Sequence, residues 1–211
     1  MDAYPDTPAG RTRWIVESRR SVARVPVSPD RPYAWLKEEE RQADGRTEPG
    51  ITVFLVNREC PWRCAMCDLW RYTLVQGRAP GAIARQMDAA FREAGIDGLD
   101  WVKLYNAGSF FDLGAIPAED HPGIGERCRG FSRVIVECHP SLVGSSLVRF
   151  RDLLGSGTRL EVAMGLETAH PLALEQLNKR FDPEGFRRAA RFIRENEIGR
   201  ASCRERVCYV V

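Results

Sequence analysis

The chain has 211 residues, of which 44% are hydrophobic and 28% charged, an ordinary composition for one globular domain. Its 31 basic residues nearly balance 29 acidic ones, so the net charge of +2 does not by itself argue for a nucleic-acid or membrane partner. No apolar run approaches the roughly 20 residues needed to cross a bilayer, and residues 1–20 lack the apolar segment of a secretory signal. These features predict a cytoplasmic protein without a membrane partner.

Residues 1–50 are rich in proline, arginine and glutamate, and are predicted to form an N-terminal extension with helices near residues 11–20 and 33–42. From residue 51 onward, apolar β-branched runs alternate with segments of helical period. The predicted strands are residues 51–57, 100–106, 132–138 and 159–165. The predicted helices are residues 82–94, 118–127, 141–154, 171–178 and 183–196.

This alternation predicts an α/β core over residues 51–197, with about four βα units whose parallel strands are joined by right-handed crossovers. A doubly wound sheet or a (β/α) barrel would satisfy the pattern, and both place functional loops at the carboxyl ends of the strands. The sequence puts four distinctive segments there: the cysteine loop, AGSFFD, ECHP and GLET. We therefore expect the functional residues to lie together at the carboxyl ends of the strands.

Cys60, Cys64 and Cys67 form a C-x3-C-x2-C loop directly after the first predicted strand. The chain has seven cysteines, and in a reducing compartment these are more typical of thiols or metal ligands than of disulfides. Three soft thiolate ligands with no fourth nearby favour an iron-sulfur cluster in which one iron lacks a protein ligand.

In spacing, in position after the first strand and in apolar surroundings, this loop resembles the radical S-adenosylmethionine (SAM) superfamily. The resemblance implies a partial (β/α) barrel, a 4Fe-4S cluster on the three cysteines, and SAM bound at the open iron. It further implies that a reductant such as flavodoxin or ferredoxin supplies one electron, which cleaves SAM to a 5'-deoxyadenosyl radical. One position departs from the family, since Met66 stands where an aromatic residue usually precedes the third cysteine.

The same resemblance implies which residues contact SAM. Gly108 and Ser109 occupy the place of the glycine turn that meets the SAM amino group. Glu137 matches an acidic residue directed at the SAM amino group or ribose. Glu167 and Lys179 stand where coproporphyrinogen-oxidase-like members have a SAM-contacting glutamine and a basic residue. For Glu137, Glu167 and Lys179, an ordinary ion pair is the alternative.

Several segments narrow the resemblance to the Elp3-like branch, and in particular to the archaeosine-synthesis radical SAM proteins. The matching features span residues 31–195 and are Arg31-Pro32 with Trp35, Met66-Cys67, LYNAGSFFD, VIVECHP and LEVAMGLETAHPLALEQLNK. Members of this branch act on tRNA nucleosides, so the resemblance implies tRNA as a candidate partner. The matching motifs serve the cluster and SAM rather than the substrate, which the sequence leaves open.

Three alternatives to an active enzyme remain open at this point. The cysteine loop could hold zinc, with the fourth ligand supplied by Cys128, Cys138 or His139. A metal- or cluster-stabilised binding module without catalysis would need the same loop. An inactive fragment of the enzyme is the third.

The last residues predict a non-native tail over residues 198–211. The segment IGRASCRERV, from Ile198 to Val207, is what a common short-read sequencing adapter encodes in one frame. On this interpretation the core is truncated after about four βα units, and Cys203 and Cys208 carry no function. We expect the natural protein to continue where this tail begins.

Overall fold

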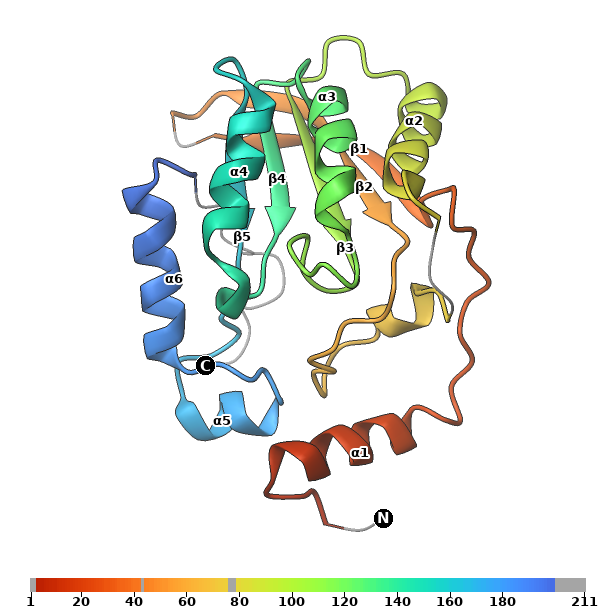
Figure 1. Cartoon of the computed structure of the whole chain (residues 1–211), viewed down its shortest axis with the longest axis vertical. Coiled ribbons are helices and arrows are strands. Elements are labelled where there is room, and N and C mark those ends of the chain that lie inside the picture. The colour runs from red at the N-terminus through yellow and green to blue at the C-terminus, as the bar shows by residue number, and fades with distance from the viewer. Residues whose placement is uncertain (1–2, 43, 76–78, 200–211) are drawn as a thin grey trace.

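A computed structural model describes residues 3–42, 44–75 and 79–199 (Figure 1). Within them, one sheet has five strands in the order β1-β2-β3-β4-β5. Their bounds are Ala34–Arg41, Thr47–Leu55, Trp101–Asn106, Arg133–Glu137 and Arg159–Ala163. β1 pairs with β2 in the antiparallel sense, and every later neighbour is parallel. The four parallel strands confirm the predicted alternation of strands and helices.

Helices cover one face of this sheet, where Figure 1 shows α2, α3 and α4 in front of the strands. The α-helices are α1 Pro8–Ser18, α2 Ala82–Ala94, α3 His121–Cys128, α4 Ser145–Leu154, α5 Pro171–Gln176 and α6 Pro183–Glu195. The 3-10 helices are η1 Leu69–Tyr72, η2 Ala118–Asp120 and η3 Pro140–Leu142. Alternate strand residues such as Val53, Leu104 and Val136 join the helices in the main hydrophobic core.

The helix predicted at residues 33–42 is wrong, because this segment is strand β1. Its glutamate-rich sequence favours a helix by propensity, but each residue from Ala34 to Arg41 pairs with a residue of β2. The hairpin turn contains Gly45 at a positive φ of 87°. Pairing with β2 also carries Glu38 and Glu40 to a buried lysine, so tertiary contacts override local propensity. The helix predicted near residues 11–20 is confirmed as α1.

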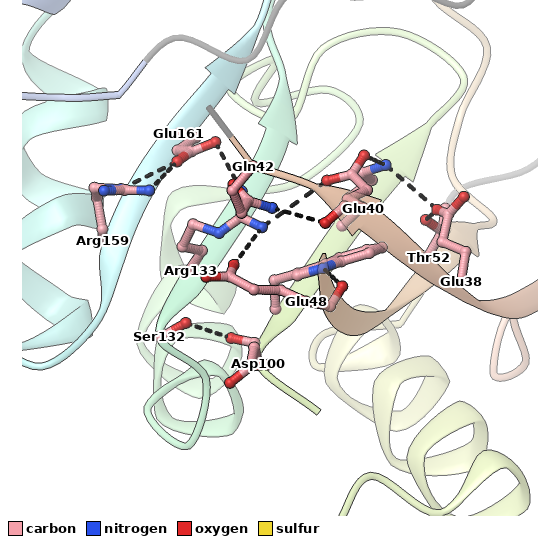
Figure 2. Close-up of polar contacts among 12 residues, drawn as sticks. Glu38, Glu40, Gln42, Glu48, Thr52, Asp100, Ser132, Arg133, Arg159 and Glu161 are labelled. Atoms are coloured by element: carbon pink, nitrogen blue, oxygen red, sulfur yellow. Dashed lines mark hydrogen bonds and ion pairs between the residues drawn. The ribbon is translucent and has the colours of Figure 1, made fainter. Parts of the chain in front are cut away.

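The face of the sheet away from the helices carries buried ion pairs at its amino half (Figure 2). The Lys103 side chain is 7% exposed and its ammonium lies 3.3 Å from a Glu38 carboxylate oxygen, with Glu40 as a second partner. The Arg133 side chain is 8% exposed and its guanidinium lies 3.0 Å from Glu48 and 3.5 Å from Glu161. Local sequence patterns do not predict this network, because its members come from all five strands of the sheet.

The sheet is open in the described part of the chain, so the closed curve of a barrel is not observed there. Beyond β5, Gly199 makes a parallel bridge to Glu161, and its N–H donates to the Leu160 carbonyl at 2.9 Å. Residues 200–211, including Cys203 and Cys208, lie outside the described residues. The non-native origin of the tail therefore stays a prediction.

Candidate metal centre

The cysteine loop follows β2 and lies between the carboxyl ends of the strands and α1 (Figure 1). Cys60, Cys64 and Cys67 are all half-buried and none is in a disulfide. The chain turns sharply here, because the Cys67 N–H donates to the Cys64 carbonyl at 3.2 Å and Arg63 has a φ of 51°. The loop thus presents three thiols from one short turn of backbone.

Burial disfavours the thiolate form of all three cysteines. It raises the pKa of Cys60 to about 11 and also raises the pKa of Cys64 and Cys67. In their thiolate forms, Cys64 and Cys67 would raise the Cys60 pKa further. A cationic group bound among the three would favour their thiolate forms, which is what a metal cluster requires.

No group of three His, Cys, Asp or Glu residues in the described part of the chain is arranged to hold a metal ion. The assignment of a cluster or of zinc to the three thiols therefore stays a prediction. The proposed fourth zinc ligands are also engaged elsewhere: Cys128 is fully buried in the core, and the Cys138 thiol donates to the His139 carbonyl at 3.3 Å.

Gly108 brings the predicted glycine turn against the first cysteine. A Cβ added at Gly108 would lie 3.2 Å from the Cys60 Cβ, and the residue has a φ of 140° that side chains rarely adopt. A glycine is therefore needed at this approach. The neighbouring Ser109 is fully buried, and its hydroxyl accepts a hydrogen bond from the His139 N–H at 3.2 Å. That hydroxyl is thus already occupied within the protein.

The three predicted charged residues gather around the other two cysteines. Glu167 and Lys179 form an ion pair of 3.1 Å, in which Glu167 has a positive φ of 64°. Beside the larger effect of burial, the charge of Lys179 lowers the pKa of Cys64 and the charge of Glu167 raises it. Glu137, at the end of β4, is half-buried and its charge raises the pKa of Cys67. The structure therefore brings these predicted site residues to the same end of the sheet.

Arg19 was not predicted as a site residue, yet it contacts the loop directly. It follows α1, and its guanidinium donates to the carbonyls of Cys64 at 3.0 Å and Cys67 at 3.2 Å. It also pairs with Glu59 at 3.2 Å. Burial lowers the pKa of Arg19, although its neighbours Glu59 and Cys67 favour the charged form. Arg19 fixes the position of two of the three cysteines.

Arg24 completes this support from the N-terminal segment. Its guanidinium donates to the Trp70 carbonyl at 2.6 Å and pairs with Glu59 at 2.6 Å. The guanidinium carbons of Arg19 and Arg24 each lie 5.3 Å from the centroid of the Trp70 ring. In the sequence, these contacts were signalled only by the arginine content of residues 1–50. That content does not show that the arginines contact Glu59 and Trp70.

The other side of the loop is held by the segment after α5. Asn178 is buried, and its side-chain amide donates to the carbonyls of Trp62 at 3.0 Å and Arg63 at 3.2 Å. The Ala65 N–H donates to the Leu177 carbonyl at 3.0 Å. The cysteine loop is thus fixed between two segments that are distant in sequence.

His139 links this segment to the loop, as a hydrogen-bonded strand-end histidine. Its Nε2–H donates to the Lys179 carbonyl at 2.8 Å, and its Nδ1 accepts from the Ser141 N–H at 3.2 Å. The imidazole stacks on Trp62 with centroids 4.0 Å apart. Burial lowers the pKa of His139 to about 4, so this neutral tautomer persists at physiological pH.

The fold is similar to that of OxsB, a cobalamin-dependent S-adenosylmethionine radical enzyme solved with aqua-cobalamin bound. The TM-score is 0.50 at 11% sequence identity, over 78% of this chain and 28% of OxsB. The chain shares the fold of part of a radical SAM enzyme. At this identity the likeness concerns the fold alone. The chain spans less than a third of OxsB.

No family model matches the sequence, and no curated protein does. In the part of the chain that the structure describes, no helix is long and apolar enough to cross a bilayer.

Proposed function

We propose that this chain is the cluster- and SAM-binding core of a radical SAM enzyme, with a 4Fe-4S cluster on Cys60, Cys64 and Cys67. The observation that carries the proposal is the presence of three half-buried thiols, none of them in a disulfide, in one short loop that follows β2. The sheet that positions this loop has the fold of a radical SAM enzyme. Three cysteine ligands leave one iron of such a cluster open for SAM.

The bound cluster would supply the one-electron reduction of SAM, and the residues of this chain would bind, orient and shield the two cofactors. Gly108 lets the backbone approach the first cysteine without a clash. Glu137 and the Glu167–Lys179 pair offer both signs of charge beside Cys64 and Cys67. SAM carries an ammonium and a carboxylate, so these groups are suited to hold its amino-acid end.

The finer parts of the proposal rest on sequence resemblance. We propose that residues 51–197 are the open part of a (β/α) barrel preceded by an extension of residues 1–50. The motifs LYNAGSFFD and VIVECHP support an Elp3-like assignment, and a tRNA nucleoside is the candidate substrate on that basis. A flavodoxin or ferredoxin is the proposed electron donor.

Anaerobic reconstitution with iron and sulfide tests the proposal. We expect about four irons per chain, a reduced-cluster electron paramagnetic resonance signal, and a change in that signal when SAM is added. Cys64→Ala should abolish the signal. Cys128→Ala is the matched control, because Cys128 is buried in the core away from the loop and its loss should leave the iron content unchanged.

Two results would count against an enzyme. A protein that retains zinc and assembles no cluster would contradict the metal assignment. A cluster whose spectrum is indifferent to SAM would indicate a metal-binding module without radical chemistry.

A further inference from the structure

A pocket of about 400 Å³ opens beside the cysteine loop, and some of the residues that support the loop also line it. Its polar lining consists of Arg19, Arg20, Arg24, Arg63 and Glu59, together with the Trp70 ring. It is formed by the end of α1, the segment after it and the cysteine loop. Figure 1 places α1 on the side of this loop away from the sheet.

The pocket has more positive than negative charge. Glu59 is shared by three guanidinium groups, at 3.2 Å from Arg19, 2.6 Å from Arg24 and 3.4 Å from Arg63. Within the described part of the chain, Arg20 pairs only with Glu17, at 2.9 Å. Four positive charges thus face two negative ones in this patch.

The surplus charge is accessible to a partner. The Arg20 side chain is 72% exposed and the Arg63 side chain 38% exposed. The other two arginines are held in place, because Arg19 and Arg24 both donate to backbone carbonyls of the loop or of Trp70. A pre-formed cationic surface of this kind favours an acidic partner and accelerates its approach.

We propose that this arginine pocket docks a small acidic electron-carrier protein. The inference rests on the proposed function, because a reduced cluster requires an electron from outside the chain. One electron would leave the reduced carrier and enter the cluster, so that the carrier is oxidised and the cluster reduced by one electron, with no bond made or broken.

The position of the pocket distinguishes this partner from a substrate. Arg19 donates to the carbonyls of Cys64 and Cys67, so a carrier seated here is separated from the thiols by little more than the loop itself. The residues proposed to hold SAM approach the same thiols from the strand ends, through Gly108, Glu137 and the Glu167–Lys179 pair. An electron donor and a substrate would then use different sides of the loop.

Charge reversal at Arg20 tests the docking. Arg20 is exposed and contacts none of the cysteines, so Arg20→Glu should fold normally. With the reconstituted protein, the rate of cluster reduction by reduced flavodoxin should fall about tenfold at low ionic strength, and Arg20→Gln should give a smaller loss. The difference should shrink at about 0.5 M salt, where screening is strong.

Arg187→Glu is the matched control. Arg187 also pairs with a glutamate three residues away in a helix, and its side chain is 69% exposed. Its charge reversal should leave the rate with flavodoxin unchanged. Binding of oxidised flavodoxin to the cluster-free chain, measured by interferometry at low salt, should weaken for Arg20→Glu and not for Arg187→Glu.

The outcomes separate this proposal from the proposed function. If the wild-type chain assembles no cluster, the proposed function fails, and the interferometry alone decides the docking. The rate with dithionite serves as the comparison, and it should be the same for Arg20→Glu and the wild type. If flavodoxin also reduces the Arg20→Glu cluster at the wild-type rate, the docking proposal is overturned. Weaker binding of tRNA or inorganic phosphate, with flavodoxin unaffected, would assign the pocket to a phosphate ligand and would also overturn it.

Discussion

The two ends of the same sheet treat buried polar groups in opposite ways. At the amino half, Lys103 and Arg133 are buried but each has at least two carboxylates as partners (Figure 2). At the carboxyl end, the thiols of Cys60, Cys64 and Cys67 are buried enough that the pKa of each is raised. The first arrangement is complete within the chain, whereas the second would be completed by the cluster that we propose.

This difference separates buried polar groups that stabilise the fold from buried polar groups that are proposed to bind a ligand. A buried charge with its partner stabilises one arrangement of the strands, and removing the partner leaves a charge that nothing compensates. Buried neutral thiols have no partner of opposite charge to lose. Their thiolate forms become favourable when a metal binds to them. The comparison predicts large effects on stability at one end and effects on cofactor retention at the other.

The largest expected effect is at the amino half. Arg133→Met should lower the free energy of unfolding by about 3 to 5 kcal/mol, because it leaves Glu48 and Glu161 without their buried partner. Arg159→Met is the control, since the Arg159 side chain is 59% exposed and its loss should cost less than about 1 kcal/mol. Urea denaturation measures both. Equal losses of unfolding free energy in the two variants would show that the buried arginine stabilises the fold no more than the exposed one.

A smaller effect on stability, with a specific effect on the metal, is expected at Gly108. Gly108→Ala should cost about 2 kcal/mol through backbone strain, and the added methyl should displace Cys60. Gly98→Ala is the control: Gly98 also has a positive φ, of 76°, but a Cβ there would meet nothing within 4 Å. Iron content after reconstitution should fall only for Gly108→Ala. Full iron retention would argue against the Cys60 contact.

Removal of the Arg19 side chain should loosen the cluster without unfolding the protein. Arg19→Gln loses the donors to the Cys64 and Cys67 carbonyls, so release of iron to a chelator should be about tenfold faster, roughly 1.4 kcal/mol. Arg13→Gln, an exposed position on α1, is the control. Identical release rates for the wild type and Arg19→Gln would show that the loop holds its shape without the arginine.

The smallest effect concerns pH. Burial lowers the pKa of His139 to about 4, below the usual value near 6.5, so the unfolded state takes up the proton first as the pH falls. The stabilising contribution is complete above pH 6.5 and is lost as the pH falls towards 4, about 1 kcal/mol by about pH 5.8. Urea titrations at pH 7 and at about pH 5.8 should show this loss of stability, and His139→Gln should reduce it. A loss of the same size in His139→Gln would contradict the role given to His139.

Predictions from sequence succeed where the signal is local. The β-branched runs that form β2 to β5 depend on neighbours within a few residues. The roles that the resemblance implies for the three cysteines, Glu167 and Lys179 stay predictions. Strand β1 was mistaken for a helix, because its glutamates have helical propensity and their partner Lys103 lies far along the chain.

The sequence by itself determined the alternation of strands and helices and the identity of the three thiols, because periodicity and spacing act over a few residues. Only the tertiary structure decided what surrounds them. The order of the strands selects Glu48 and Glu161 as partners of Arg133, and the path of the chain brings Arg19 and Asn178 to backbone carbonyls of the cysteine loop. These partners are set by distance in space, which local patterns of residues do not encode.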